Sequence, residues 1–244
     1  MRHALSVAAI ATLLLTGSVA PGLAAAPTSI PVANISPAPG QVVGVAMPVT
    51  VTFAQPVTDR AAAEQSVHFT APASPKGSFE WIGNDVLRFD PSDYWPAHSV
   101  IALSVGSFKA NFQTGSAVVG VADLDAHTFT VSIDGQVVRD MPASMGKPRH
   151  TTPIGSFTAL EKQSPVVMDS RTIGIPLSDP EGYKLTVYDA VRVTWGGVYV
   201  HGAPWSVGSQ GYANVSHGCI NLSPDNAAWY YDQVSIGDPI IVQA

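Results

Sequence analysis

Apolar and polar side chains alternate in short runs through the first half of the chain. The run Val49–Phe53 alternates apolar and polar residues, which is typical of a strand with one buried face. Two further runs, 79–82 and 86–89, flank the residues Gly-Asn-Asp at 83–85, and this turn signal predicts a β-hairpin. Residues 99–105 form another such run. Because no helical period lies between these runs, the pattern predicts a β-sandwich of roughly 85 to 90 residues.

The second half begins with the same kind of pattern. A boundary is predicted near 113–116, and a strand follows at 118–121. The runs 128–133 and 136–139 flank Asp134-Gly135, a pair that suits the turn whose twist matches that of paired strands. We therefore expect a second hairpin here.

One helix is expected, close to the C-terminus. Ser223 is a favoured N-cap residue, Pro224 suits the first helical position, and Asp225 places a negative charge in the first turn. The helix should continue through 227–234, and a closing strand should follow at 240–242. The second domain is thus predicted to be mostly β, with a short helix packed on the sheet.

Residues 163–185 follow neither period. They are interrupted by Pro165, Gly174, Pro176, Pro180 and Gly182. Long irregular loops in compact domains are usually functional or disordered. The apolar residues of this segment do not suit a solvated linker, so we expect a functional loop; the alternative is a surface loop without a role. Those apolar residues are Met168, Ile173, Ile175 and Tyr183.

Composition limits the possible functions. The chain has 244 residues, enough for two modest domains, and its 21 Gly and 20 Pro favour turns and short strands over long helices. The net charge is −6 and no basic patch is visible, so nucleic acid is not an expected partner.

The N-terminus has the pattern of a secretory signal. A basic start is followed by an apolar stretch to Val19 and by the small residues of 21–26, so residues 1–26 are predicted to be a signal peptide. The alternative is an uncleaved leader that anchors the protein in the membrane. Either way, we expect export across the inner membrane.

The one cysteine of the chain is the candidate for chemistry. Cys219 follows His217 and Gly218, and His201 ends an apolar run upstream. A lone thiol beside histidines is a candidate nucleophile, because a histidine can take its proton and lower its pKa toward neutrality. One alternative is a small buried apolar residue. Zinc ligation is disfavoured, since the spacing is wrong and no second cysteine exists, so no metal or cofactor is expected.

These residues carry a resemblance to a known family. His201-Gly202 and, after a loop, Ser216-His217-Gly218-Cys219-Ile220-Asn221 resemble the catalytic motif of L,D-transpeptidases of the YkuD type. Segments around it are similar to the actinobacterial branch of that family: 145–147, 151–157, 168–170, 182–183 and 201–206. The chain departs from some relatives at Gly202, where they carry Ser.

The resemblance implies a domain order and an activity. The order is a bacterial Ig-like domain (27–116) and a β-rich catalytic domain (117–244) whose lid is about 163–185. The activity is a peptidoglycan L,D-transpeptidase of the periplasm or cell wall, an acyltransferase acting in cell-wall biogenesis and cell shape. It would join the third residues of donor and acceptor stem peptides (3→3 cross-links) through a cysteine thioester, and carbapenems would acylate it. An L,D-carboxypeptidase and a wall-binding module with an inactive site remain alternatives.

The resemblance also implies residue roles. Cys219 is the acyl carrier and His201 the general base, whose second ring nitrogen should bind a backbone carbonyl, most plausibly that of Gly202. The N–H groups of His217, Gly218 and Cys219 are expected to form an oxyanion hole. Residues expected to face substrate are Met168, Tyr183, Ser216, Asn221 and Trp205. A turn role for Asn221 and simple packing for Trp205 are alternatives, and the remaining histidines are interpreted as structural: His68, His98, His127 and His150.

Overall fold

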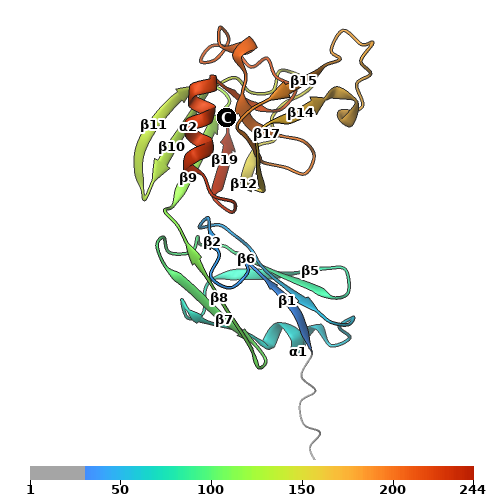
Figure 1. Cartoon of the computed structure of the whole chain (residues 1–244), viewed down its shortest axis with the longest axis vertical. Helices are drawn as coiled ribbons and strands as arrows, with labels where there is room; N and C mark the ends of the chain where they lie inside the picture. The colour runs from blue at the N-terminus through green and yellow to red at the C-terminus, as the bar shows by residue number, and fades with distance from the viewer. Residues whose placement is uncertain (1–30) are drawn as a thin grey trace, which may run out of the picture.

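The computed structural model describes residues 31–244, so the predicted signal peptide lies outside the described residues. Figure 1 shows two units arranged along the long axis of the molecule, with the chain passing from one to the other after β8. No helix within the described residues is both long and apolar enough to span a bilayer.

The first unit is a β-sandwich, as predicted. One sheet has the order β1-β3-β6-β5 and the other β2-β8-β7-β4. Leu87, Ile101 and Phe112 are fully buried in its core. The elements are β1 (Val32–Ser36), β2 (Val42–Val43), β3 (Val49–Phe53), α1 (Arg60–Gln65), β4 (Val67–Ala71), β5 (Gly77–Ile82), β6 (Val86–Pro91), β7 (Val100–Val105) and β8 (Phe108–Thr114).

The second unit is built from two larger sheets and a small one. The strand orders are β11-β10-β9-β19-β12, β13-β16-β17-β18 and β14-β15. Its elements are β9 (Val118–Asp123), β10 (Thr128–Ile133), β11 (Gln136–Pro142), β12 (Gly155–Thr158), β13 (Glu161–Gln163), β14 (Val166–Asp169), η1 (Ser170–Ile173), β15 (Lys184–Val187), β16 (Ala190–Arg192), β17 (Tyr199–Gly202), η2 (Pro204–Ser206), β18 (Ile220–Leu222), α2 (Pro224–Gln233) and β19 (Pro239–Gln243). The predicted mostly β fold is confirmed.

The two predicted hairpins and the predicted helix are present. β5 pairs with β6 and β10 with β11. Asp134 and Gly135 both have positive φ (50° and 81°), as a type I′ turn requires. The side chain of Ser223 caps α2 by accepting a hydrogen bond from the Asn226 N–H at 3.3 Å. These predictions are confirmed, and each of them depends only on residues that are close together in the sequence.

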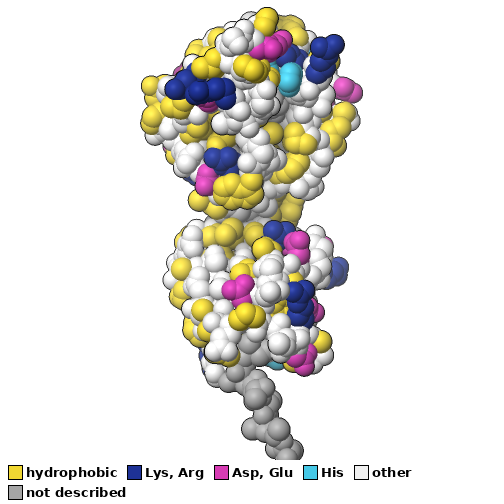
Figure 2. Space-filling model, turned by 90° about the vertical axis from the view of Figure 1, so that its right-hand side faces the viewer, with side chains coloured by type: hydrophobic (Ala, Val, Ile, Leu, Met, Phe, Trp, Pro, Cys, Tyr) yellow, Lys and Arg dark blue, Asp and Glu magenta, His cyan; other side chains and the backbone are white. Residues whose placement is uncertain are grey.

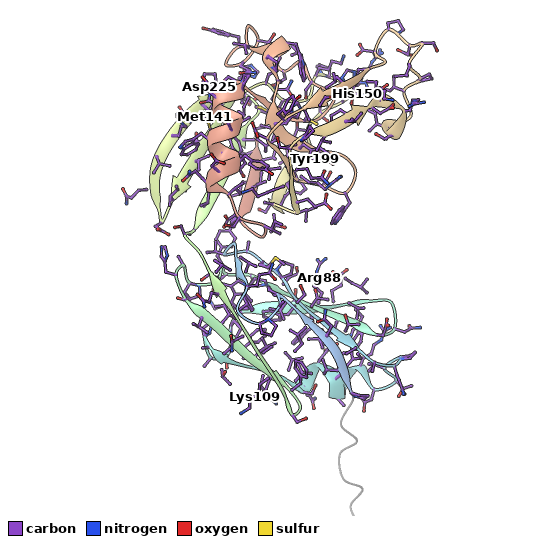
Figure 3. The ribbon with its side chains drawn as sticks, in the orientation of Figure 1. Arg88, Lys109, Met141, His150, Tyr199 and Asp225 are labelled. Carbon is purple, nitrogen blue, oxygen red and sulfur yellow. The ribbon has the colours of Figure 1, made fainter. Side chains whose placement is uncertain are left out.

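Helix α2 covers the interior of the second unit. Tyr230 of α2 is buried and meets Phe129 of β10 edge to face, with ring centroids 4.9 Å apart. Met141 of β11 lies in the same core, in the region between the sheet and α2 (Figure 3). This packing anchors α2, which closely follows the segment that carries Cys219.

The segment 163–185 differs from the predicted irregular loop. It contains an antiparallel hairpin in which β14 pairs with β15, placing Met168 opposite Leu185. β-branched residues in both strands favour this pairing, with Val166 opposite Val187 and Val167 opposite Thr186. Proline and glycine gather in the connection 174–182, so the two ends of the segment are free to pair.

The two units are joined by backbone hydrogen bonds at a narrow waist (Figure 2). The N–H groups of Gly44 and Ala46 donate to the carbonyls of Ile236 (2.8 Å) and Gly237 (2.9 Å). Between them the Val45 N–H donates to Oδ1 of Asp238 at 3.3 Å. The Asp238 side chain is inaccessible to solvent, and burial raises the pKa of its carboxyl to about 6.

Candidate active site

A cavity of about 330 Å³ lies where the hairpin β14–β15, strand β17, η2 and the loop before β18 meet. It brings together most of the site residues that were predicted from the sequence. Its lining is Met168, Tyr183, Leu185, His201, Trp205, Ser206, Ser209, Val215, Ser216, His217, Cys219 and Asn221.

Cys219 lies at the end of the loop 216–219, immediately before β18, and is partly buried. Its Sγ donates to the carbonyl of Gly197 at 3.6 Å. Burial raises the pKa of this thiol to about 11, which a hydrogen bond from the backbone of Tyr199 opposes only in part. The predicted lowering of the thiol pKa is therefore wrong, because desolvation penalises the thiolate more than its neighbours stabilise it.

His201 is on β17 and only 3% exposed. Its Nδ1 lies 2.9 Å from the carbonyl of Gly202, the partner predicted from the sequence. Because a carbonyl can only accept, Nδ1 carries the proton, and Nε2 of the neutral ring is an acceptor. Burial lowers the pKa of His201, which favours this neutral form.

The strand register relates this histidine to the nucleophile. β17 and β18 are parallel, with Val200 opposite Ile220 and His201 opposite Asn221. His201 is thus on the strand beside the residues that follow Cys219, and both side chains line one cavity. The arrangement places an uncharged base and a protonated thiol on one cavity.

The loop 216–219 is shaped by its own serine. The Ser216 hydroxyl donates to the carbonyl of Cys219 at 2.6 Å and accepts from the Gly218 N–H at 3.1 Å. The Gly218 N–H is therefore engaged and does not serve as an oxyanion donor, which corrects the prediction made for it. Within residues 31–244, no hydrogen bond is found from the N–H of His217 or Cys219. These two groups are the available donors.

A second segment of the chain also holds Gly218 in place. No role was predicted for this segment from the sequence. The Thr152 hydroxyl accepts from the Gly146 N–H and donates to the Gly218 carbonyl, both at 2.9 Å, and Thr152 is buried. A Cβ on Gly146 would lie 2.0 Å from the carbonyl oxygen of His150, so only glycine fits there. Gly218 itself has φ +120°, which also favours glycine.

The contacts of His217 do not suit a simple role as a second base. Its Nε2 lies 2.7 Å from Oε2 of Glu181, and its ring packs against the rings of His150 (4.9 Å) and Tyr183 (5.0 Å). Burial lowers the pKa of His217, and the Glu181 carboxylate opposes this effect. His150 is interpreted from the sequence as structural and Glu181 is not selected, since neither belongs to a recognisable motif.

Met168 and Tyr183 both line the cavity, from the two ends of the hairpin segment. Leu185 lies opposite Met168 in the strand pairing and lines it too, although the sequence analysis did not select it. Both apolar side chains pack, as Cys219 does, against the buried cluster of Val187, Ala190 and Tyr199. Burial raises the pKa of Tyr183, so its phenol stays protonated.

Asn221 and Trp205 also line the cavity. Asn221 is buried, and its Nδ2 donates to the Ser206 hydroxyl at 3.2 Å, while its Oδ1 has no hydrogen-bond partner among the described residues. Trp205 is 55% exposed, with its ring 6.0 Å from that of His201. It also lines a second, smaller cavity of about 140 Å³ on its other side.

No cluster of three or more histidine, cysteine, aspartate or glutamate side chains is placed to hold a metal ion between residues 31 and 244.

Comparison with known proteins gives consistent matches. Residues 117–242 match the family of L,D-transpeptidase catalytic domains, and residues 23–107 match a bacterial Ig domain. The chain is 59% identical to L,D-transpeptidase 1 of Mycobacterium tuberculosis over 98% of its own length and 96% of that protein.

Solved structures agree. An L,D-transpeptidase from Mycobacterium smegmatis has 70% identity and a TM-score of 0.84, covering 89% of this chain and 100% of that one. LdtMt1 in complex with imipenem has 61% identity and a TM-score of 0.81, with coverage of 87% and 98%. L,D-transpeptidase 3 of M. tuberculosis with a faropenem-derived adduct has 52% identity and a TM-score of 0.81, with coverage of 88% and 99%.

Proposed function

The chain belongs to the L,D-transpeptidase family, and from this premise we propose that it cross-links the stem peptides of peptidoglycan. The observation that carries the proposal is the cavity in which the Cys219 thiol, the neutral His201 and the hairpin β14–β15 meet. A thiol beside an uncharged histidine suits acyl transfer, because the imidazole can take the thiol proton as sulfur attacks a carbonyl.

The first half of the reaction forms a thioester. Sγ of Cys219 attacks the carbonyl carbon of the third residue of a donor tetrapeptide, and Nε2 of His201 takes the thiol proton. The backbone N–H groups of Cys219 and His217 stabilise the oxyanion, and losing one such donor commonly costs about 3 kcal/mol of barrier. The intermediate collapses as the imidazolium of His201 protonates the departing amine of D-alanine.

The second half transfers the acyl group. An amine of the acceptor stem attacks the thioester carbonyl and gives its proton to His201. Collapse of this intermediate breaks the C–S bond, and the proton returns to Sγ of Cys219. The product is an amide between the third residues of two stems, and no net change occurs in the enzyme.

Hydrolysis by an L,D-carboxypeptidase would use the same thioester with water as acceptor. The apolar side chains of Met168 and Leu185 close to Cys219 favour transfer, because they limit water near the thioester. A wall-binding module with an inactive site would not need a buried His201 with its tautomer fixed by Gly202. Transfer is therefore the reading that the site supports best.

The proposal includes where the enzyme acts and what inhibits it. Residues 1–26 export the chain to the periplasm or cell wall, whether cleaved or kept as an anchor. Residues 27–116 form the Ig-like domain and 117–244 the catalytic domain with its lid at about 163–185, which the two family matches support. Acylation of Cys219 by carbapenems is supported by the complex of LdtMt1 with imipenem.

Mass spectrometry of the products from a tetrapeptide stem tests the proposal. We expect a cross-linked dimer with loss of D-alanine, and no product from Cys219→Ala. A tripeptide alone would identify a carboxypeptidase, and unchanged substrate with the native enzyme would refute both enzymatic readings.

A further inference from the structure

One carboxylate in the lid connects three separate segments of the catalytic unit. Glu181 lies in the connection between η1 and β15, and its Oε2 accepts a hydrogen bond from Nε2 of His217 at 2.7 Å. The same oxygen is paired with Nζ of Lys147. Lys147 belongs to the connection between β11 and β12, and His217 to the loop that carries Cys219.

The lid presents Glu181 on a tight turn. The N–H of Glu181 donates to Oδ1 of Asp179, and the N–H of Gly182 donates to the Asp179 carbonyl, both at 2.8 Å. A Cβ on Gly182 would lie 2.4 Å from the carbonyl oxygen of Pro176, so the turn needs glycine. The position of the carboxylate is therefore set by the lid itself, before any substrate binds.

Hydrogen bonds join Tyr183, the residue that follows the turn, to η1. Tyr183 and Ser170 exchange two hydrogen bonds, in which the Tyr183 N–H donates to the Ser170 hydroxyl at 3.0 Å and the Ser170 N–H donates to the Tyr183 carbonyl at 2.9 Å. The Tyr183 ring then rests on the His217 ring. Glu181 and Tyr183 thus contact the same imidazole from one turn of the lid.

This contact orients His217. A carboxylate only accepts, so Nε2 of His217 carries the proton, and its ring plane is held between Tyr183 and His150. The ionisable groups around the imidazole are Glu181 and Tyr183 from the lid, and Lys147 and His150 from the connection between β11 and β12. Opening the lid must break both contacts of the Glu181 carboxylate.

We infer that Glu181 is a positioning residue that latches the lid onto the nucleophile loop and fixes the orientation of His217. The inference rests on the proposed function of the site. When the latch is closed, the lid holds Met168 and Leu185 near Cys219 and keeps the His217 backbone N–H in place beside it. When it opens, substrate can enter, and a carboxylate of the stem peptide can replace Glu181 at Lys147.

Two variants of the full chain separate this role from a general loosening of the lid. Glu181→Gln removes the charge, and Lys147→Met removes the cation but keeps the carboxylate beside His217. Both should speed hydrogen exchange of the amides in β14 and β15 about fivefold, in line with the loss of a partly exposed ion pair. Asp169→Asn is the matched control, because Asp169 pairs with Arg171 within the lid and touches neither Lys147 nor His217.

The ¹⁵N-detected titration of the His217 ring provides a readout that needs no turnover. Glu181 favours the imidazolium and Lys147 disfavours it, so the midpoint should fall in Glu181→Gln, rise in Lys147→Met and stay unchanged in Asp169→Asn. The rate of acylation by imipenem should fall about fivefold in Glu181→Gln.

Unchanged lid exchange in both variants, or midpoints that move in the same direction, would overturn the latch. If the native protein is not acylated while exchange and titration behave as expected, the latch stands and the proposed function fails.

Discussion

Asp238 offers a test of how the two units are held together. Its carboxylate is buried at the waist, where it accepts hydrogen bonds from the backbone N–H groups of Val45 (3.3 Å) and Ser235 (2.7 Å). Burial is the largest effect on it and raises the pKa of Asp238 from the ordinary 3.8 to about 6. The perturbation is Asp238→Asn, which keeps the shape and removes the titration.

The magnitude follows from linkage. The folded state binds the proton more tightly than the unfolded state, so the contribution of Asp238 to stability is full below pH 3.8 and is lost as the pH rises to about 6. Each pKa unit corresponds to about 1.4 kcal/mol, so the loss is about 3 kcal/mol in total. About 2 kcal/mol of it falls between pH 4 and pH 7.

The assay is urea unfolding of the native protein and of Asp238→Asn at a series of pH values. The stability of the variant relative to the native protein should increase by about 2 kcal/mol from pH 4 to pH 7, whatever the constant cost of the amide. Asp140→Asn, which replaces an exposed carboxylate of the same unit, should show no comparable trend. A difference between native and Asp238→Asn that stays constant over this range would refute the reasoning.

Further expectations concern the site. Imipenem should add one acyl group to the native protein, as seen by intact mass, and an adduct that persists in Cys219→Ala would contradict its role. His201→Gln should slow acylation about a hundredfold or more, as is usual for loss of a general base, and His217→Ala should cost less; the reverse order would make His217 the base. Gly202→Ser should change acylation little, because a Cβ there meets only ordinary contacts at 3.6 Å. Tyr183→Ala should slow acylation by enlarging the cavity, and equal rates would exclude a catalytic part for the lid.

The features predicted correctly are those encoded over a few residues. The Asp134-Gly135 turn and the Ser223 cap depend on neighbours in the sequence, and the hydrogen bond between His201 and Gly202 joins adjacent residues. Such signals can be read without knowing what packs against them.

The features that were missed depend on contacts between distant segments. Thr152 reaches Gly218 across the fold, and Glu181 reaches both Lys147 and His217. The pKa of Cys219 was predicted in the wrong direction because the sequence places a histidine beside it but does not reveal the burial that dominates. Local pattern identifies the reactive groups, whereas tertiary packing sets their protonation and their supports.

The pairing of β9 with β19 has a consequence for the order in which the protein matures. These are the first and last strands of the catalytic unit, and Gly120 lies opposite Ile240 in a parallel pair. Contacts so distant along the chain form late, because the entropy of closing a long loop must be overcome first. The central sheet therefore cannot be completed before β19 has been synthesised and has paired with β9.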